Sequence, residues 1–151
     1  SPSGRDEIQF MFTANGAERM VELQKVASGG ELSRIMLCIK KLMAEHTGMP
    51  TMIFDEIDVG VSGSIADKMG QLLSDMGEHM QIFAITHLPQ IASKGETHLL
   101  VYKEFDASNH AQTKIKILSK KERIMEIARL LSGEKMSSAA VENAKVLLGV
   151  N

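Results

Sequence analysis

Three short segments carry side chains suited to phosphate chemistry, and the first is a glycine turn. Residues 28–31 read Ser-Gly-Gly-Glu and directly precede an apolar pattern of helical spacing. Two glycines let the backbone approach a ligand closely, and a helix N-terminus offers unpaired N–H groups and a positive dipole end to an anion. Ser28 adds a hydroxyl at the N-cap position. The turn favours a phosphate site, but an ordinary helix cap with loop glycines would look the same.

The second segment is a pair of carboxylates that ends a short apolar run. Residues 51–54 are Thr-Met-Ile-Phe, and Asp55 and Glu56 follow directly. Carboxylates are almost never fully buried without a partner, and ligands bind at the carboxyl ends of parallel strands. Asp55 is suited to hold Mg²⁺, directly or through water, and Glu56 to position and deprotonate a water. The competing interpretation is an acidic pair that caps the following loop.

The third segment is a histidine that ends the next apolar run. Residues 80–85 are followed by Thr86 and His87. An imidazole there could contact a terminal phosphate or an attacking water, whereas a lone histidine at a strand end is more commonly a polar turn residue. Each segment is weak evidence alone, but their order and spacing along one strand–helix–strand unit are hard to obtain by chance.

Hydrophobic periodicity predicts the elements that position these segments. Helical spacing runs from Ser28 to about residue 46 and again over 64–78, and short apolar runs predict strands at 51–54 and 80–85. The strand at 51–54 is continuously apolar, which predicts burial on both faces, and the short connections predict that the two strands are parallel. Further elements are expected in this order: a strand at 6–13, a turn at 15–16, a loop at 17–27, a short segment at 89–93, a hairpin of 98–103 and 113–118, and helices around a break at Gly133.

Composition bounds the class of protein. The 151 residues predict one domain over 1–151, and 44% hydrophobic residues suffice for a core. A net charge of −2 excludes a general polyanion binder, and the basic run near Lys116 is better explained as a solvated surface than as a DNA site. Neither a membrane-spanning run nor a signal peptide is visible, so a cytoplasmic protein with no membrane partner is expected.

Jointly, the three segments resemble the motifs of an ABC-type ATPase head. Residues 28–31 resemble its signature turn, residues 52–56 its Walker B strand with the catalytic glutamate, residues 57–63 its D-loop, and His87 its switch histidine. Transporter heads usually continue after that glutamate with Pro-Thr, whereas Ile57-Asp58 stands here, as in SMC-like ATPases. The stretches 26–37, 54–63 and 85–92 are similar to bacterial SMC-like ATPases of DNA double-strand-break repair.

The resemblance implies an α/β fold: the C-terminal half of an ABC/SMC-type P-loop NTPase head, with a mainly parallel sheet, flanking helices, and a C-terminal hairpin and helices. It implies ATP and Mg²⁺ as cofactors. It assigns catalysis to Glu56 and His87, Mg²⁺ to Asp55, ATP of an opposing head to Ser28, Gly29, Gly30 and Glu31, and the D-loop region to Asp58 and Ser62. Ser62 stands where most ABC proteins carry Asp, which matches the repair ATPases.

The chain contains no GxxxxGK[ST] phosphate loop, so half of the nucleotide machinery is missing from it. The resemblance implies that this half of the head, a second identical head and DNA are the partners. ATP sandwiched between two heads would drive their closure in recombination and repair at the bacterial nucleoid. The isolated chain is expected to be inactive. The alternatives are a non-hydrolysing, partner-binding module and, less favoured, a transporter nucleotide-binding domain.

The strand at 80–85 lacks the neighbour that the resemblance gives it. We therefore expect its free edge either to pair with a second copy of the chain or to be covered by a terminal segment, with the strand near Phe10 the leading candidate.

Overall fold

The computed structural model describes Gly4 and residues 8–13, 20–25, 29–106, 109–133 and 135–150. The chain divides into two compact units, Ser1–Gly48 and Met49–Asn151. The glycine turn belongs to the first unit, and the acidic pair and His87 belong to the second.

The first unit contains a short strand pair and one long helix. Strands β1 (Met11–Phe12) and β2 (Val21–Glu22) are antiparallel, and a 3₁₀ turn, η1 (Leu23–Lys25), follows. Of the strand predicted at 6–13, the described residues 8–13 contain the short strand Met11–Phe12, and the elements within 20–25 were not predicted. The turn predicted at 15–16 lies outside the described residues.

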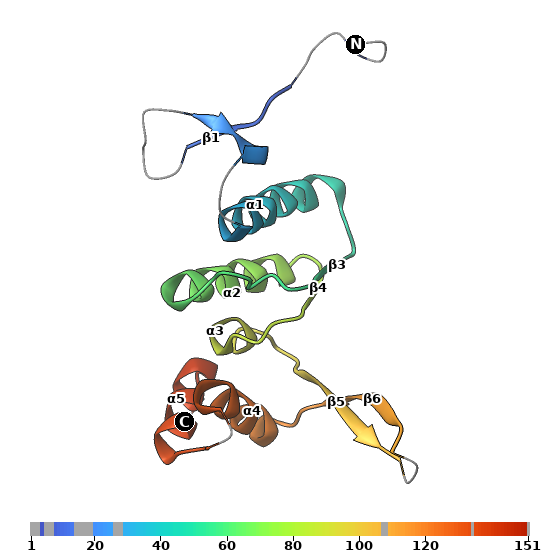
Figure 1. The fold of residues 1–151 in the computed structure, drawn as a ribbon, viewed down its shortest axis with the longest axis vertical. Coiled ribbons are helices and arrows are strands. Elements are labelled where there is room, and N and C mark those ends of the chain that lie inside the picture. The colour runs from blue at the N-terminus through green and yellow to red at the C-terminus, as the bar shows by residue number, and fades with distance from the viewer. Residues whose placement is uncertain are drawn as a thin grey trace. The chain divides into compact units, whose positions relative to one another are not determined.

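Helix α1 (Gly29–Thr47) is the longest element and confirms the predicted helix to within a residue at its end (Figure 1). Gly48 follows with φ 62°, the left-handed conformation that commonly ends a helix and that glycine adopts at little cost. Residues 29–31 are therefore the start of a helix, as the sequence predicted.

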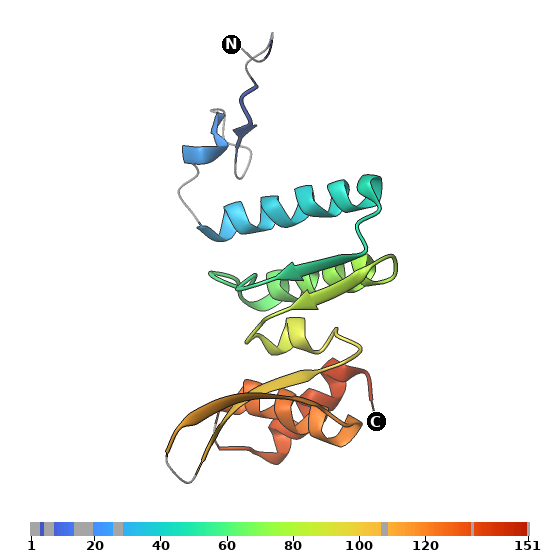
Figure 2. The same ribbon diagram turned by 90° about the vertical axis from the view of Figure 1, so that its right-hand side faces the viewer.

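The second unit begins with the predicted strand–helix–strand crossover. Strands β3 (Thr51–Phe54) and β4 (Gln81–Ala84) pair in parallel, and helix α2 (Gly63–Gly77) connects them. Figure 2 shows the two strands side by side and pointing the same way. Of the three strand pairs in the described residues, this is the parallel one, so the predicted mainly parallel sheet is represented by a single pair.

The prediction that β3 is buried on both faces was wrong. Phe54 is buried against the core, whereas Ile53 is 64% exposed. Successive side chains of a strand point to opposite faces, and within this unit the pair is a two-stranded sheet next to a single crossover helix. The apolar sequence of β3 could not reveal that only one of its faces is covered inside the unit.

Helices α2 and α3 (Pro89–Ala92) approach each other unusually closely at Gly70. A Cβ atom built on Gly70 would lie 3.0 Å from the Gln90 carbonyl oxygen and 3.1 Å from the Ile91 Cα. Both contacts are with backbone, which cannot swing aside as a side chain can. The absence of a side chain at Gly70 therefore sets the spacing between α2 and α3.

The rest of the unit is a hairpin followed by two packed helices. Strands β5 (Leu99–Phe105) and β6 (Ala111–Ile117) are antiparallel and extend further toward their turn than predicted. Helices α4 (Lys120–Ser132) and α5 (Ser138–Leu148) pack around a small core, and Gly133 separates them as predicted. Their fully buried members are Ile127, Ala128 and Ala144.

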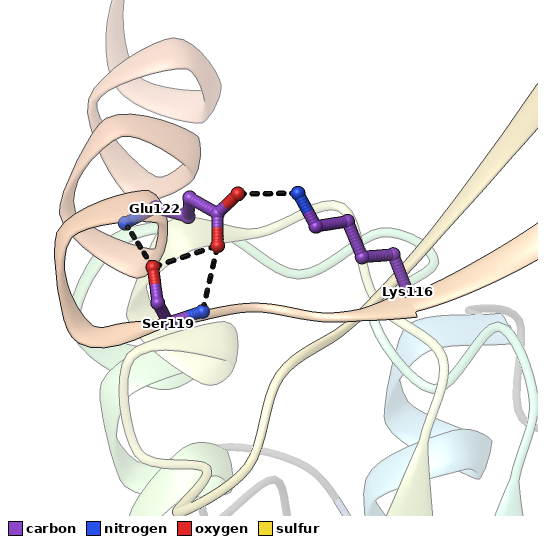
Figure 3. Close-up of polar contacts among 3 residues, drawn as sticks. All are labelled: Lys116, Ser119 and Glu122. Atoms are coloured by element: carbon purple, nitrogen blue, oxygen red, sulfur yellow. Dashed lines mark hydrogen bonds and ion pairs between the residues drawn. The ribbon is translucent and has the colours of Figure 1, made fainter.

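A capping box joins the hairpin to α4 (Figure 3). The Ser119 hydroxyl accepts from the Glu122 backbone N–H, and the Glu122 carboxylate accepts from the Ser119 N–H at 2.9 Å. The same carboxylate is ion-paired with the Lys116 ammonium group of β6. The hydrogen bond from Lys116 and those from Ser119 lower the pKa of Glu122 to about 2.

The capping box predicts a local response to acid. A carboxyl whose pKa is lowered by folding stabilises the fold fully above its unfolded pKa, here 4.5, and this contribution is lost as the pH falls through about 2. We expect the Glu122 carboxyl carbon to titrate near pH 2 by NMR, together with the amide signals of the first turn of α4. A Glu122→Gln variant should lack this response, and titration of the wild-type group near pH 4.5 would contradict it.

Candidate functional site

The parallel pair brings two of the three motif segments to one edge. Phe54 lies opposite Ala84, and the Ile85 N–H donates to the Phe54 carbonyl at 2.9 Å. Asp55 and Glu56 leave this edge from β3, while Thr86 and His87 leave it from β4. The acidic pair and the histidine, separated by some thirty residues of sequence, therefore meet at the carboxyl ends of adjacent strands, where α/β proteins bind ligands.

The backbone reverses sharply at Glu56. Its φ is 51°, a left-handed conformation that costs a residue other than glycine on the order of 1–3 kcal/mol. The Val59 N–H then donates to the Glu56 carbonyl at 3.4 Å, and the Val61 N–H to the Asp58 carbonyl at 3.1 Å. The turn leaves the Glu56 side chain exposed and returns Asp58 to the interior.

Asp58 is the buried anchor of the site, only 3% exposed. Its Oδ2 atom accepts from the Thr86 hydroxyl at 2.6 Å and from the His87 backbone N–H at 2.9 Å, and it lies 3.0 Å from His87 Nδ1. Burial alone would raise the pKa of Asp58, but the hydrogen bonds from Thr86 and the His87 N–H outweigh it and hold the pKa below its ordinary value. Asp58 is therefore an ionised carboxylate that is engaged through Oδ2.

His87 is held at one ring nitrogen and open at the other. Its side chain is 74% exposed, although Nδ1 contacts the buried Asp58. The Thr86 hydroxyl also accepts from the Leu88 N–H at 3.1 Å, which fixes the chain on both sides of the histidine. Sequence reasoning gave Thr86 no role. The available signal was its place at the same strand end, directly before the histidine.

The acidic pair fits a Mg²⁺–nucleotide complex better than a metal site made of protein alone. Asp55 and Glu56 are both exposed, and among the described residues no hydrogen bond or ion pair occupies either side chain. The described residues also contain no group of three or more His, Cys, Asp or Glu side chains able to hold a metal. Mg²⁺ is commonly bound through one or two carboxylates together with phosphates and waters, which is what Asp55 offers.

The glycine turn begins α1 in the other unit. Gly29 is exposed, and a Cβ atom built on it would meet no described atom within 4 Å, so packing inside the chain does not demand a glycine there. Gly30 is buried and Glu31 half-buried. Ser28 lies outside the described residues. The turn belongs to the first unit, whereas Glu56 and His87 belong to the second.

Ser62 is the remaining residue predicted for the site. It is exposed and forms the N-cap of α2 in an extended conformation, but its hydroxyl makes no capping hydrogen bond. A serine at this position usually accepts from a backbone N–H of the first turn. Its hydroxyl is thus available to another molecule, in contrast to Asp58 in the same loop.

The sequence is similar to known proteins along almost its whole length. Over 148 residues, 98% of the chain, it is 41% identical to the DNA repair protein RecN of Haemophilus influenzae. Over an equally long match it is 42% identical to RecN of Vibrio cholerae. The chain is homologous to part of RecN. It spans 26% of the length of these RecN proteins, and no protein-family model matches it.

A structural likeness agrees with the RecN match. A solved chain from a study of ATP-driven dimerization and DNA-stimulated activation of SMC ATPases superposes with a TM-score of 0.58. The match covers 78% of this chain and 69% of the other. At 17% identity it shows similarity of fold alone. The fold is that of part of an SMC-type ATPase head, which confirms the predicted fold class. Within the described part of the chain, no helix has the length and apolar character to cross a bilayer.

Proposed function

We propose that the chain is the C-terminal portion of an ATP-binding and ATP-hydrolysing SMC-like head, and that the whole protein acts in bacterial DNA double-strand-break repair and recombination. The observation that carries the proposal is the edge where β3 and β4 end, because it presents an exposed acidic pair beside a histidine anchored by a buried carboxylate. Similarity to RecN and to an SMC ATPase supports the class of protein.

Each residue of this edge has a distinct chemical task. Asp55 would hold Mg²⁺, and the ion would supply positive charge to neutralise the phosphates of bound ATP. Glu56 would orient the attacking water and accept its proton, since its exposed carboxylate is not engaged within the described chain. His87 would meet the terminal phosphate or that water through Nε2, because its Nδ1 is occupied by Asp58.

The glycine turn would act on a second nucleotide. Ser28, Gly29, Gly30 and Glu31 would cover ATP held by an opposing head, so that two heads sandwich each nucleotide and closure depends on ATP. The free space at Gly29 supports this role, because the chain itself does not require a glycine there. The exposed hydroxyl of Ser62 would face the same interface. The partners would be the N-terminal half of the head, a second head and DNA, in the bacterial cytoplasm at the nucleoid.

The proposal is tested by comparing the isolated chain with the full-length protein. The chain lacks the lysine-bearing loop that cradles the β- and γ-phosphates, so we expect no steady-state ATP hydrolysis from residues 1–151 and clear hydrolysis from the full-length protein. If the isolated chain hydrolysed ATP and Glu56→Gln abolished that activity, the proposal that residues 1–151 carry only part of the nucleotide site would be contradicted. A full-length protein that binds partners but never hydrolyses ATP would support the non-hydrolysing alternative instead.

A further inference from the structure

We propose that Asp58 is a positioning residue for catalysis: it fixes the proton of His87 on Nδ1 and thereby presents Nε2 to the nucleotide or the attacking water. This inference rests on the proposed function of the same edge, but its structural part can be tested without any nucleotide. It differs from the D-loop role expected from the sequence, which would have Asp58 contribute to the nucleotide site directly.

The Asp58 side chain is buried, unlike the other acidic residues of its loop. Asp58 is 3% exposed, whereas the acidic pair before it and Ser62 after it are exposed. A buried carboxylate is tolerated only when hydrogen bonds replace its lost hydration, and here the Thr86 hydroxyl and the His87 N–H supply them. Asp58 is thus turned away from any nucleotide at the edge and toward the β4 end.

The contact between Asp58 and His87 indicates which ring nitrogen carries the proton. An ionised carboxylate can only accept hydrogen bonds, so the ring nitrogen 3.0 Å from Asp58 Oδ2 must carry a proton. That nitrogen is Nδ1 of His87. In the neutral ring, Nε2 is then the acceptor, and in the charged ring it is a donor, so Nε2 is the atom at which His87 gains or loses its proton.

Asp58 also connects the ends of the two strands. Asp58 lies two residues after Glu56, whose strained φ of 51° starts the turn, and it binds Thr86 and His87 on the other strand end. A strained backbone persists where its surroundings over-determine it. The single carboxylate therefore links the turn that contains the Glu56 backbone to the imidazole ring of His87.

The first experiment reads the protonation of the ring nitrogens directly. In ¹⁵N-labelled chain of residues 1–151, at a pH where His87 is neutral, long-range ¹H–¹⁵N spectra should show Nδ1 protonated and Nε2 unprotonated. Asp58→Asn should weaken the preference for protonation at Nδ1, because the neutral amide oxygen that would face Thr86 and His87 attracts that proton less than a carboxylate does. Asp67→Asn is the matched control, since exposed Asp67 is ion-paired with Lys94 and not with Thr86 or His87, and it should leave the His87 signals unchanged.

Two results would overturn the inference. One is a wild-type spectrum with Nε2 protonated in the neutral ring, which decides the question even if Asp58→Asn does not fold. The other is a folded Asp58→Asn variant, shown by a dispersed amide spectrum, whose His87 nitrogens are the same as in wild type.

The second experiment separates positioning from binding in the full-length protein. Asp58→Asn should lower kcat for ATP hydrolysis by about 10–100-fold, with little change in KM, because the histidine is misdirected while the nucleotide contacts remain. Asp67→Asn should retain full activity. An unchanged kcat in Asp58→Asn would refute the catalytic part of the inference, whereas a wild-type protein without ATPase activity would refute the proposed function and leave the NMR result standing.

Discussion

Glu56→Gln in the full-length protein is expected to lower the rate of ATP hydrolysis by on the order of 10²–10⁴ while ATP still binds. Gln has nearly the size of Glu and can still hydrogen-bond to water, but it cannot accept the proton. The side chain is exposed and the left-handed backbone is the same for both residues, so folding should be unaffected. The measurements are kcat, nucleotide affinity, and sedimentation, which should show an ATP-bound dimer that does not open.

Glu78→Gln provides the matched control for this variant. Glu78 is an exposed glutamate at the end of α2, away from the edge where β3 and β4 end, and its replacement should leave hydrolysis unchanged. Near-normal turnover in Glu56→Gln would mean that another group takes the proton. Loss of ATP binding in that variant would show that Glu56 holds the nucleotide complex rather than the water.

Gly29→Ala is expected to make the protein slightly more stable and much less active. Alanine is a better helix former than glycine, by up to about 1 kcal/mol, and its methyl group would meet no described atom within 4 Å. If an opposing nucleotide approaches the backbone there, the same methyl group displaces it, and a 1 Å displacement lowers the rate by on the order of 10². Thermal unfolding and kcat, measured on the same preparation, test both halves of the prediction.

Gly77→Ala is the matched control, because a Cβ atom there would also meet no described atom within 4 Å and the residue lies in the last turn of α2. It should leave kcat unchanged. Retained hydrolysis in Gly29→Ala would count against close approach of a ligand to the turn.

Mixing tests whether the turn acts on the opposing head. A larger and charged substitution, Gly29→Asp, should abolish hydrolysis, and a mixture of that variant with Glu56→Gln should regain it, because each mixed dimer contains one site with neither defect. Failure to regain activity, with both variants folded and pairing, would contradict action across the dimer.

Local patterns in the sequence predicted the longer elements and the meeting of two strand ends at the candidate site. The helix at α1, the crossover through α2 and the parallel pairing of β3 with β4 follow from periodicity and short connections, and the structure has them all. Placing Glu56 and His87 at one edge followed from that topology alone. These features depend on spacing along the chain, which a sequence displays directly.

Other features depend on neighbours that a sequence does not display. The exposure of Ile53 depends on how many layers cover the sheet, and the two-residue strands β1 and β2 are too short for a periodic pattern. The inward turn of Asp58 depends on the reversal at Glu56 and on a hydroxyl from another strand. Among the described residues β3 is the strand that pairs with β4. Cover of the other edge of β4 by the strand near Phe10 stays a prediction, because that strand and β4 belong to different units. Pairing of that edge with a second copy stays a prediction.

The close approach at Gly70 has a consequence for how this sequence can vary. Helix α3 begins at Pro89, directly after the segment that carries Thr86 and His87, so the spacing between α2 and α3 determines the path by which the chain leaves the edge where β3 and β4 end. Any larger residue at position 70 must push the α3 backbone outward. In a complete mutational survey, we therefore expect this buried mid-helix glycine to tolerate as few substitutions as the candidate site residues. The geometry of the candidate site thus depends on the absence of a side chain at Gly70 as well as on its carboxylates.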